Sequence, residues 1–363
     1  MAIDPRRSHS HNDAMSENSD RSTSLQEIVR EAHGARRPLA IRGGGSKRLL
    51  TGDIAGEPLD ITRHTGIVNY EPTELVITAR AGTPLADIEA TLASSHQMLG
   101  FEPPHFGDKA TLGGTLACGL SGPRRPYTGS ARDFTLGTTI INGQGEILRF
   151  GGQVMKNVAG YDVSRLMVGA RGTLGVLLDI SLKVLPRPET EMTLSFEMAA
   201  SDAIVSMNRW AAQPLPLSAA CHHGETLSLR LSGSDAGVRA ARAKLGGETV
   251  AEGDKFWEKI REHRHGFFQD AAPLWRISVP PSATMLTLDG KTLLDWGGAQ
   301  RWIKSSASAT DIKQAASVAG GFAQLFHARK QTDAEQKSGV LQNISAELRK
   351  SFDPHRILNA AIS

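Results

Sequence analysis

The stretch of sequence that decides the fold reads Thr-Leu-Gly-Gly-Thr-Leu-Ala-Cys-Gly-Leu-Ser-Gly and covers residues 111–122. Two shorter glycine-rich stretches flank it, Arg-Gly-Gly-Gly-Ser-Lys at 42–47 and Gly-Ala-Arg-Gly-Thr-Leu-Gly-Val at 169–176. Glycine has no Cβ, so backbone N–H groups can converge in such stretches, and converging N–H groups bind phosphate oxygens. A tight turn is the alternative for any single glycine. Three stretches in this order, each beside a predicted strand or helix, predict a site for a long ligand with a diphosphate.

The spacing of the glycines excludes two common phosphate-binding motifs. The first stretch lacks the G-x-x-x-x-G-K-S/T spacing of a P-loop. No G-x-G-x-x-G follows a predicted strand and opens a helix, so NAD bound to a Rossmann unit is not expected. A diphosphate held between loops from different parts of one domain fits better. Arg42, Lys47, Arg124 and Arg125 lie in or beside the loops, either as phosphate partners or as solvated surface charges.

Composition narrows the class of protein. The 363 residues suit two domains, and the net charge of +3 comes from 41 basic residues spread along the chain. This spread argues against nucleic acid as the main partner and fits an anionic cofactor. Cys118 and Cys221 are the only cysteines and lack metal-ligand spacing, which predicts a reduced, cytoplasmic setting. No apolar run reaches the ~18 residues of a membrane span, so we expect membrane association, at the inner membrane, only through partners.

Periodicity predicts alternating helices and strands in the first half. Polar residues 1–23 are expected to be a disordered tail. Ser24 and Glu27 predict a capping box, and Thr83 with Pro84 predicts a second helix start. Strands are predicted at 38–41, 75–79, 138–142, 146–150 and 174–184, the last with its even positions buried.

The second half is less regular. Pro186 and Pro188 mark a domain boundary. Strands are predicted at 226–231 and 275–279, helices at 235–245, 307–318 and 341–352, and connections at 320–321 and 330–338.

Several longer stretches resemble a known family. They are residues 42–47 with Gly52, 102–107, 111–125, 132–134, 151–162, 169–176 and 352–359. With them the chain resembles the FAD-binding oxidoreductases of the vanillyl-alcohol oxidase, or PCMH, type. Within that group it is similar to the FAD-binding E subunits of bacterial glycolate oxidase, above all in the run Gly-Gly-Gln-Val-Met-Lys-Asn-Val-Ala-Gly-Tyr-Asp at 151–162.

The resemblance implies an α+β fold, with a PCMH-type two-lobed FAD-binding domain and a smaller α+β cap domain. We expect the FAD-binding domain at 24–188, the cap or substrate-side domain at 189–340, and a C-terminal segment at 341–363 that returns to the FAD domain. Residues 43–47 would wrap the pyrophosphate of FAD, 111–122 would close on it from the other side, and 172–176 would lie beside the flavin ring. The residues expected to bind FAD are Arg42, Gly43, Gly44, Gly45, Ser46, Lys47, Pro104, Thr111, Gly113, Gly114, Thr115, Gly119, Gly122, Arg125, Lys156, Gly160, Tyr161, Gly172, Thr173, Gly175, Val176 and Asn359.

Two departures from the family pattern bear on the chemistry. Relatives with covalent flavin often carry a histidine in the first loop, where this chain has Ser46 and Lys47, so we expect non-covalent FAD. The motif His-x-x-Gly-Asp-Gly-Asn-x-His of larger relatives is absent after residue 188, and no metal is expected. The nearest cluster, Cys221-His222-His223-Gly224, is assigned a structural or surface role.

The catalytic residues stay unassigned. Oxidation of a 2-hydroxy acid needs a base for the hydroxyl proton and a cation for the carboxylate. The second half offers His263, His265, Arg276, His327 and Arg329, but their spacing defines no site. Arg276 either points into the cap interface or lies at the surface on a strand edge.

The resemblance implies an FAD subunit of a glycolate-oxidising complex. It would act with a catalytic FAD-containing D subunit and an iron–sulfur F subunit, because this chain lacks the cysteines for a cluster. A stand-alone FAD-dependent dehydrogenase for a small 2-hydroxy acid and a non-catalytic assembly subunit are the alternatives.

Overall fold

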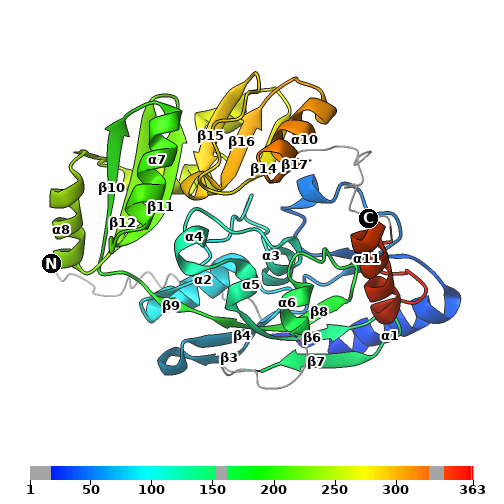
Figure 1. The fold of residues 1–363 in the computed structure, drawn as a ribbon. Coiled ribbons are helices and arrows are strands. Elements are labelled where there is room, and N and C mark those ends of the chain that lie inside the picture. Colours follow the sequence, from blue (N-terminus) through cyan, green and yellow to red (C-terminus); the bar gives the residue numbers. More distant parts are fainter. Residues whose placement is uncertain (1–17, 153–161, 327–338, 361, 363) are drawn as a thin grey trace, which may run out of the picture.

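The computed structural model describes residues 18–152, 162–326, 339–360 and 362. Within them the chain forms two units, each built on its own large sheet (Figure 1). We call the described residues of 18–188 and 339–362 the N-terminal unit, and residues 189–326 the cap. The chain passes between the two sheets after Pro186, and the first cap strand begins at Thr190.

The described residues of the N-terminal unit form a five-stranded antiparallel sheet with the order β3-β4-β8-β6-β7. In its central strand the predicted burial of the even positions is confirmed, because Val176, Leu178, Ile180 and Leu182 are all buried. The prediction of a single buried face is wrong, since Leu177 and Ser181 are buried as well. The predicted hairpin is also confirmed, and the Asn142 side chain accepts hydrogen bonds from the amides of Gln144 and Glu146 in its turn. The strands are β3 (Ile67–Glu71), β4 (Val76–Arg80), β6 (Thr135–Ile141), β7 (Ile147–Gly151) and β8 (Val176–Lys183).

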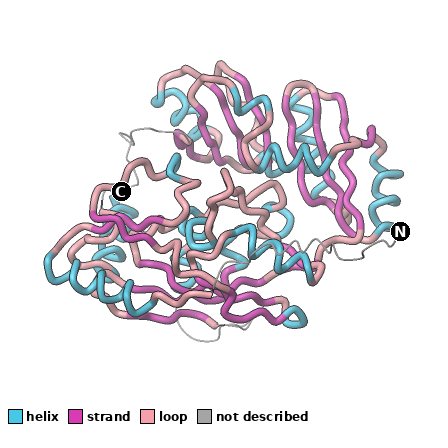
Figure 2. The backbone as a smooth tube through the Cα atoms, turned by 180° about the vertical axis from the view of Figure 1, so that it is seen from behind, coloured by secondary structure: helices cyan, strands magenta, loops and turns pink. Residues whose placement is uncertain are grey.

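Short elements complete this unit. A parallel pair, β1 (Leu39–Arg42) and β2 (Glu57–Asp60), precedes the sheet, and β5 (Gln97–Met98) pairs with β9 (Leu185–Pro186). The helices are α1 (Ser22–Ala35), α2 (Leu85–Ser94), α3 (Leu112–Cys118), α4 (Arg125–Thr128), α5 (Ala131–Phe134), α6 (Val163–Met167) and α11 (Gly339–Phe352). Seen from behind, mostly loops and short helices of this unit face the cap (Figure 2).

The N-terminal predictions need three corrections. Ser19 already pairs with Thr65 and Asp20 with Arg80, so residues 18–23 are ordered. Helix α1 begins at Ser22, and the Ser24 hydroxyl donates to the Arg21 carbonyl, so Ser24 is not the N-cap. Helix α2 begins at Leu85, so Pro84 precedes the helix and Thr83 is not its N-cap. The Thr83 hydroxyl instead accepts a hydrogen bond from the amide of Gly66.

The cap is an eight-stranded sheet in the order β13-β10-β12-β11-β15-β16-β14-β17 over its described residues. The predicted strands at 226–231 and 275–279 and the helices at 235–245 and 307–318 are confirmed within two residues at each end. The strands are β10 (Thr190–Glu197), β11 (Leu217–His223), β12 (Thr226–Gly233), β13 (Glu248–Thr249), β14 (Leu274–Ser278), β15 (Lys291–Asp295), β16 (Gln300–Lys304) and β17 (Phe322–Leu325). The helices are α7 (Ala200–Ala211), α8 (Asp235–Leu245), α9 (Gly253–Arg261) and α10 (Ala309–Val318).

A hydrophobic cluster joins the two units. Leu120 of the N-terminal unit is buried with Trp257, Trp302 and Phe326 of the cap, and Phe106 packs against this cluster. Trp296 of the cap donates its indole N–H to the Gly122 carbonyl over 3.0 Å. The loops that carry the glycine motifs are therefore fixed to the cap by both apolar and polar contacts.

Candidate functional site

The first two glycine stretches lie against each other, as the sequence predicted for loops that share one ligand. A Cβ on Gly43 would lie 2.7 Å from the Thr111 hydroxyl, and one on Gly44 only 1.4 Å from the Lys109 carbonyl. Such contacts are impossible for any residue with a side chain. Gly45 adopts a φ of +74°, which glycine accommodates without strain.

The first loop presents a row of free donors. The amides of Gly43, Gly44, Gly45, Ser46 and Lys47 have no acceptor among the described residues. The Lys47 side chain is buried, and its Nζ makes only long contacts, 3.3 Å to the His105 carbonyl and 3.4 Å to the Thr115 hydroxyl. Burial lowers the pKa of Lys47. A buried cation beside unpaired amides is an anion-binding arrangement.

The second stretch differs from the expectation of an opposed set of amides. The amide of Gly113 donates to Ala81 O over 2.7 Å, that of Gly119 to Thr115 O over 3.0 Å and that of Gly122 to Phe101 O over 2.9 Å. The amide of Gly114 donates to the hydroxyl of Thr111, which caps α3. Gly113 and Gly122 instead allow close packing, since a Cβ would lie 2.7 Å from Ala81 and 2.3 Å from the Glu102 carbonyl. The amides of Gly113, Gly114, Gly119 and Gly122 are therefore already paired within the chain, unlike those of the first loop.

The C-terminal segment connects the first loop to the third glycine stretch. The Asn359 side chain accepts from the amide of Ile41 over 2.8 Å and donates to the Arg171 carbonyl over 2.7 Å. Gly172 has a φ of +73°, and a Cβ there would lie 2.7 Å from the Asn359 amide nitrogen. Thr173 donates to Ala170 O, while Gly175 packs on Ile140 and Val176 starts β8. Asn359 thus holds two predicted FAD-binding segments together.

The other predicted residues have different positions. Arg42 is exposed, and Pro104 lines a cleft between the units. Lys156, Gly160 and Tyr161 lie outside the described residues, as does the family motif around them.

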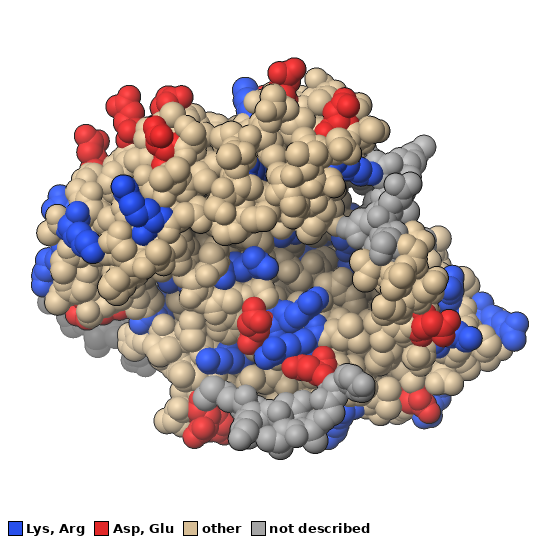
Figure 3. Space-filling view, viewed as in Figure 1, with Lys and Arg blue, Asp and Glu red and all other residues tan. Residues whose placement is uncertain are grey.

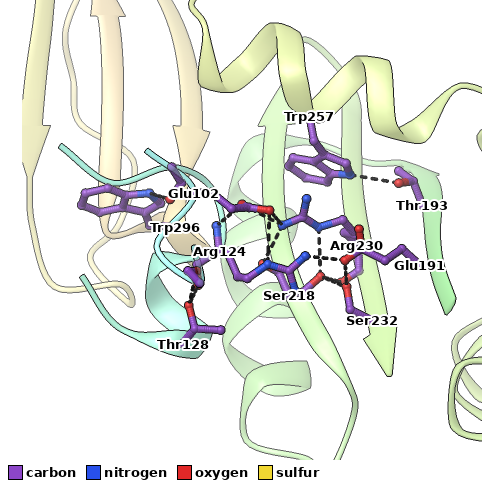
Figure 4. A network of polar contacts seen from close by, with 12 residues as sticks. Glu102, Arg124, Thr128, Glu191, Thr193, Ser218, Arg230, Ser232, Trp257 and Trp296 are labelled. Carbon is purple, nitrogen blue, oxygen red and sulfur yellow. Dashed lines mark hydrogen bonds and ion pairs between the residues drawn. The ribbon is translucent and has the colours of Figure 1, made fainter. Parts of the chain in front are cut away.

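Arg124 is not available to a phosphate. Its guanidinium group pairs with Glu102 and with Glu191 of the cap, and Arg230 of the cap pairs with the same Glu102 (Figure 4). The two arginines lower the pKa of Glu102 against the opposing effect of burial. This four-residue ion network, Glu102, Arg124, Glu191 and Arg230, connects the N-terminal unit to the cap.

A narrow cleft, partly open to solvent, lies between the two units. The N-terminal unit contributes Phe106 and residues 120–123, and the cap contributes Arg276, Asp295, Gln300 and Trp302. The strand-edge surface position considered for Arg276 is wrong. β14 lies between β16 and β17 and is not an edge strand, and the Arg276 side chain lines the cleft.

Two buried charges dominate the electrostatics of this cleft. Burial, with a smaller contribution from the charge of Glu102, raises the pKa of Asp295 to about 7, although hydrogen bonds from Trp296 and Gln300 and the charge of Arg276 oppose the shift. Burial and the charge of Arg125 lower the pKa of Arg276 to about 10. Cys221 and Tyr127 also face Asp295, and burial raises the pKa of both.

The sequence analysis missed Asp295, Trp296 and Gln300. The signal was the pair Gly297-Gly298, which marks a tight turn between β15 and β16 and brings Asp295 opposite Gln300.

The histidines of the cap make structural contacts. His222 bonds to Met198 O over 2.9 Å, and the His223 ring packs on His265 and Phe267. Among the described residues no group of three or more His, Cys, Asp or Glu side chains could hold a metal ion. In the same part of the chain, no helix has the length and apolar character needed to span a membrane.

Comparisons with known proteins agree with this geometry. Residues 20–151 match the FAD binding domain family. The chain is 51% identical over 340 residues to glycolate oxidase subunit GlcE of Escherichia coli (strain K12), covering 94% of this chain and 96% of that protein. The chain belongs to the GlcE family. This GlcE-family chain is an FAD-binding protein of an oxidoreductase family, and the buried Lys47 and the unpaired amides of the first loop fit that cofactor.

Other relatives of the GlcE-family chain are more distant in sequence. Glycolate oxidase subunit GlcD of Bacillus subtilis (strain 168) is 34% identical over 130 residues, 35% of this chain and 27% of that protein. An alkyldihydroxyacetonephosphate synthase structure aligns with a TM-score of 0.66 at 16% identity, covering 93% of this chain and 75% of that one. At this identity the likeness shows the fold, and it confirms the predicted PCMH-type α+β architecture.

Proposed function

We propose that this chain is the FAD-binding subunit of a complex that oxidises glycolate to glyoxylate. The observation that carries the proposal is the row of free amides from Gly43 to Lys47 in a chain that matches a glycolate oxidase subunit over nearly its whole length. FAD, when bound, accepts the two electrons of the oxidation. The first-loop amides and Lys47 would hold its pyrophosphate, and Ser46 in the family's histidine position supports non-covalent binding.

The cysteine content supports a multi-subunit enzyme. A cluster needs four protein ligands, whereas the whole chain has Cys118 and Cys221. We therefore assign electron transfer to an iron–sulfur F subunit and expect a D subunit as a second flavin-containing partner. Membrane association, if present, would come through these partners.

The test is the visible spectrum of the purified full chain, recorded before and after anaerobic addition of glycolate. Yellow protein that bleaches only when the partner subunits are added supports a dependent subunit. Bleaching of the chain alone would instead identify a stand-alone dehydrogenase. Colourless protein, both alone and after reconstitution with FAD, would contradict FAD binding and leave the assembly-subunit alternative.

A further inference from the structure

The cleft between the two units contains an arginine with unused donors. Arg276 donates from Nε to the Gln300 side-chain oxygen over 2.8 Å, and its two terminal nitrogens have no acceptor among the described residues. Its guanidinium carbon lies 5.2 Å from the centre of the Trp296 ring and 6.0 Å from that of Trp302. The indoles hold the planar group in place without neutralising it.

A second arginine approaches the same indole from the N-terminal unit. The guanidinium carbon of Arg125 lies 4.2 Å from the centre of the Trp296 ring. Among the described residues no carboxylate forms an ion pair with Arg125 within 4 Å, although the charge of Asp133 acts on it. Two like charges near one ring repel each other, and an anion between the units would offset that repulsion. Lysine and arginine side chains are visible in the groove between the units (Figure 3).

The carboxylate of Asp295 contacts Arg276 only through the side chain of Gln300. Gln300 accepts from Arg276 and donates to the Asp295 carboxylate over 3.4 Å, so it links the two residues. Asp295 is 3% exposed and also accepts from the amide of Trp296. This arrangement orients Arg276 and leaves its terminal nitrogens facing the cleft.

We propose that Arg276 and Arg125 bind the carboxylate of a small 2-hydroxy acid in this cleft, and that Gln300 and Asp295 position Arg276. This inference rests on the proposed function, and it adds the substrate-binding residues. A guanidinium group binds a carboxylate through two parallel hydrogen bonds, which the two free nitrogens of Arg276 can supply. Phe106, Leu120 and Trp302 give the cleft apolar walls, which suit a short carbon chain.

The location supports a substrate rather than an unrelated anion. The cleft is lined by residues 120–122, which end the second glycine stretch, and by Pro123. Arg171 of the third stretch is close enough to lower the pKa of Arg276. The proposed carboxylate site therefore adjoins two of the three predicted FAD-binding segments.

The experiment titrates oxalate, a two-carbon acid with no hydrogen on carbon to be removed, into the full chain and into the reconstituted complex. Binding is measured by calorimetry and by tryptophan fluorescence, which Trp296 and Trp302 should report. We expect Arg276→Met to weaken binding by about 10- to 100-fold, as for the loss of charged hydrogen bonds. Arg276→Lys should retain part of the affinity. Arg209→Met is the matched control, because Arg209 also lies over an indole, Trp210, but on the exposed face of α7.

Flavin content is measured in every sample and separates the two proposals. Wild-type protein that retains FAD but binds no oxalate in either form would overturn the carboxylate site and leave the proposed function intact. Equal binding by wild type and Arg276→Met, or equal loss in Arg209→Met, would also overturn it. Loss of FAD from wild type would count against the proposed function, and calorimetry would still decide on oxalate.

Discussion

Replacing Glu102 with glutamine should show how strongly the four-residue ion network joins the two units. Glu102 accepts hydrogen bonds from the side chains of both Arg124 and Arg230, and it also accepts from the amide of Arg124. Removing one partner of a buried ion pair costs about 3–5 kcal/mol, because the other charge remains buried. Arg124 keeps Glu191, and glutamine keeps one acceptor oxygen, so we expect the lower end, about 3 kcal/mol.

The assay is thermal unfolding at pH 7.5, followed by circular dichroism. A loss of about 3 kcal/mol predicts a fall in Tm of roughly 6–12 °C, at about 2–4 °C per kcal/mol for a large domain. Asp53→Asn is the control, since its ion pair with Arg48 is exposed, and it should leave Tm unchanged.

The pH dependence provides a second check on this prediction. The pKa of Glu102 is lowered in the folded protein, so its contribution is complete above the unfolded pKa, about 4.3, and is lost as the pH falls through the folded value. The gap between wild type and Glu102→Gln should therefore narrow below about pH 4.3. An unchanged Tm at pH 7.5, or a gap that does not depend on pH, would refute the stabilising role of the network.

Three further predictions concern the two sites. Lys47→Met should weaken FAD binding by about 10- to 100-fold, measured by equilibrium dialysis. Arg48→Met is the control, because Arg48 is exposed, and it should leave FAD affinity unchanged. Equal FAD affinities of the wild type and Lys47→Met would exclude a phosphate-binding role for Lys47. Asp295 has a pKa near 7, so it gains negative charge as the pH rises from 6 to 8, and oxalate affinity should fall over this range. Asp295→Asn should abolish this pH dependence. If the oxalate affinity of Asp295→Asn still falls with pH, another group is responsible. Gly44→Ala should yield little folded, flavin-containing protein, because the new Cβ would overlap the Lys109 carbonyl. Gly34→Ala is the control: a Cβ there has no atom within 4 Å, and the change should stabilise α1 by about 0.5–1 kcal/mol. Similar yields of the two variants would contradict the close approach of Gly44 to Lys109.

Local patterns in the sequence predicted much of the fold. The burial of the even positions of β8 follows from their apolar side chains, and the β6–β7 hairpin follows from its glycine turn. The contact between Gly43 and Thr111 was expected from two glycine stretches that serve one ligand. These features depend on short segments, where residue type and spacing carry the information.

The cleft depends on pairings that spacing does not reveal. Arg276 meets Gln300 only because β14 and β16 pair antiparallel with Arg276 opposite Trp302. Arg124 forms an ion pair with Glu191, which lies 67 residues away in the sequence. The amides of Gly113 and Gly122 likewise donate hydrogen bonds to carbonyls that are distant in sequence, those of Ala81 and Phe101. Tertiary contacts of this kind decide whether a charged or polar group is free for a ligand.

The two hydrogen bonds by which the Asn359 side chain links Ile41 to Arg171 have a consequence for biosynthesis. Leu39 and Ile41, synthesised early, obtain hydrogen-bond partners from Ile357 and Asn359, and Asn359 is synthesised 318 residues after Ile41. A nascent chain halted before Asn359 would carry all three glycine stretches yet lack the link between the first and the third. Flavin loading should therefore follow synthesis of the segment around Asn359, and a chain cut before Asn359 should yield apoprotein.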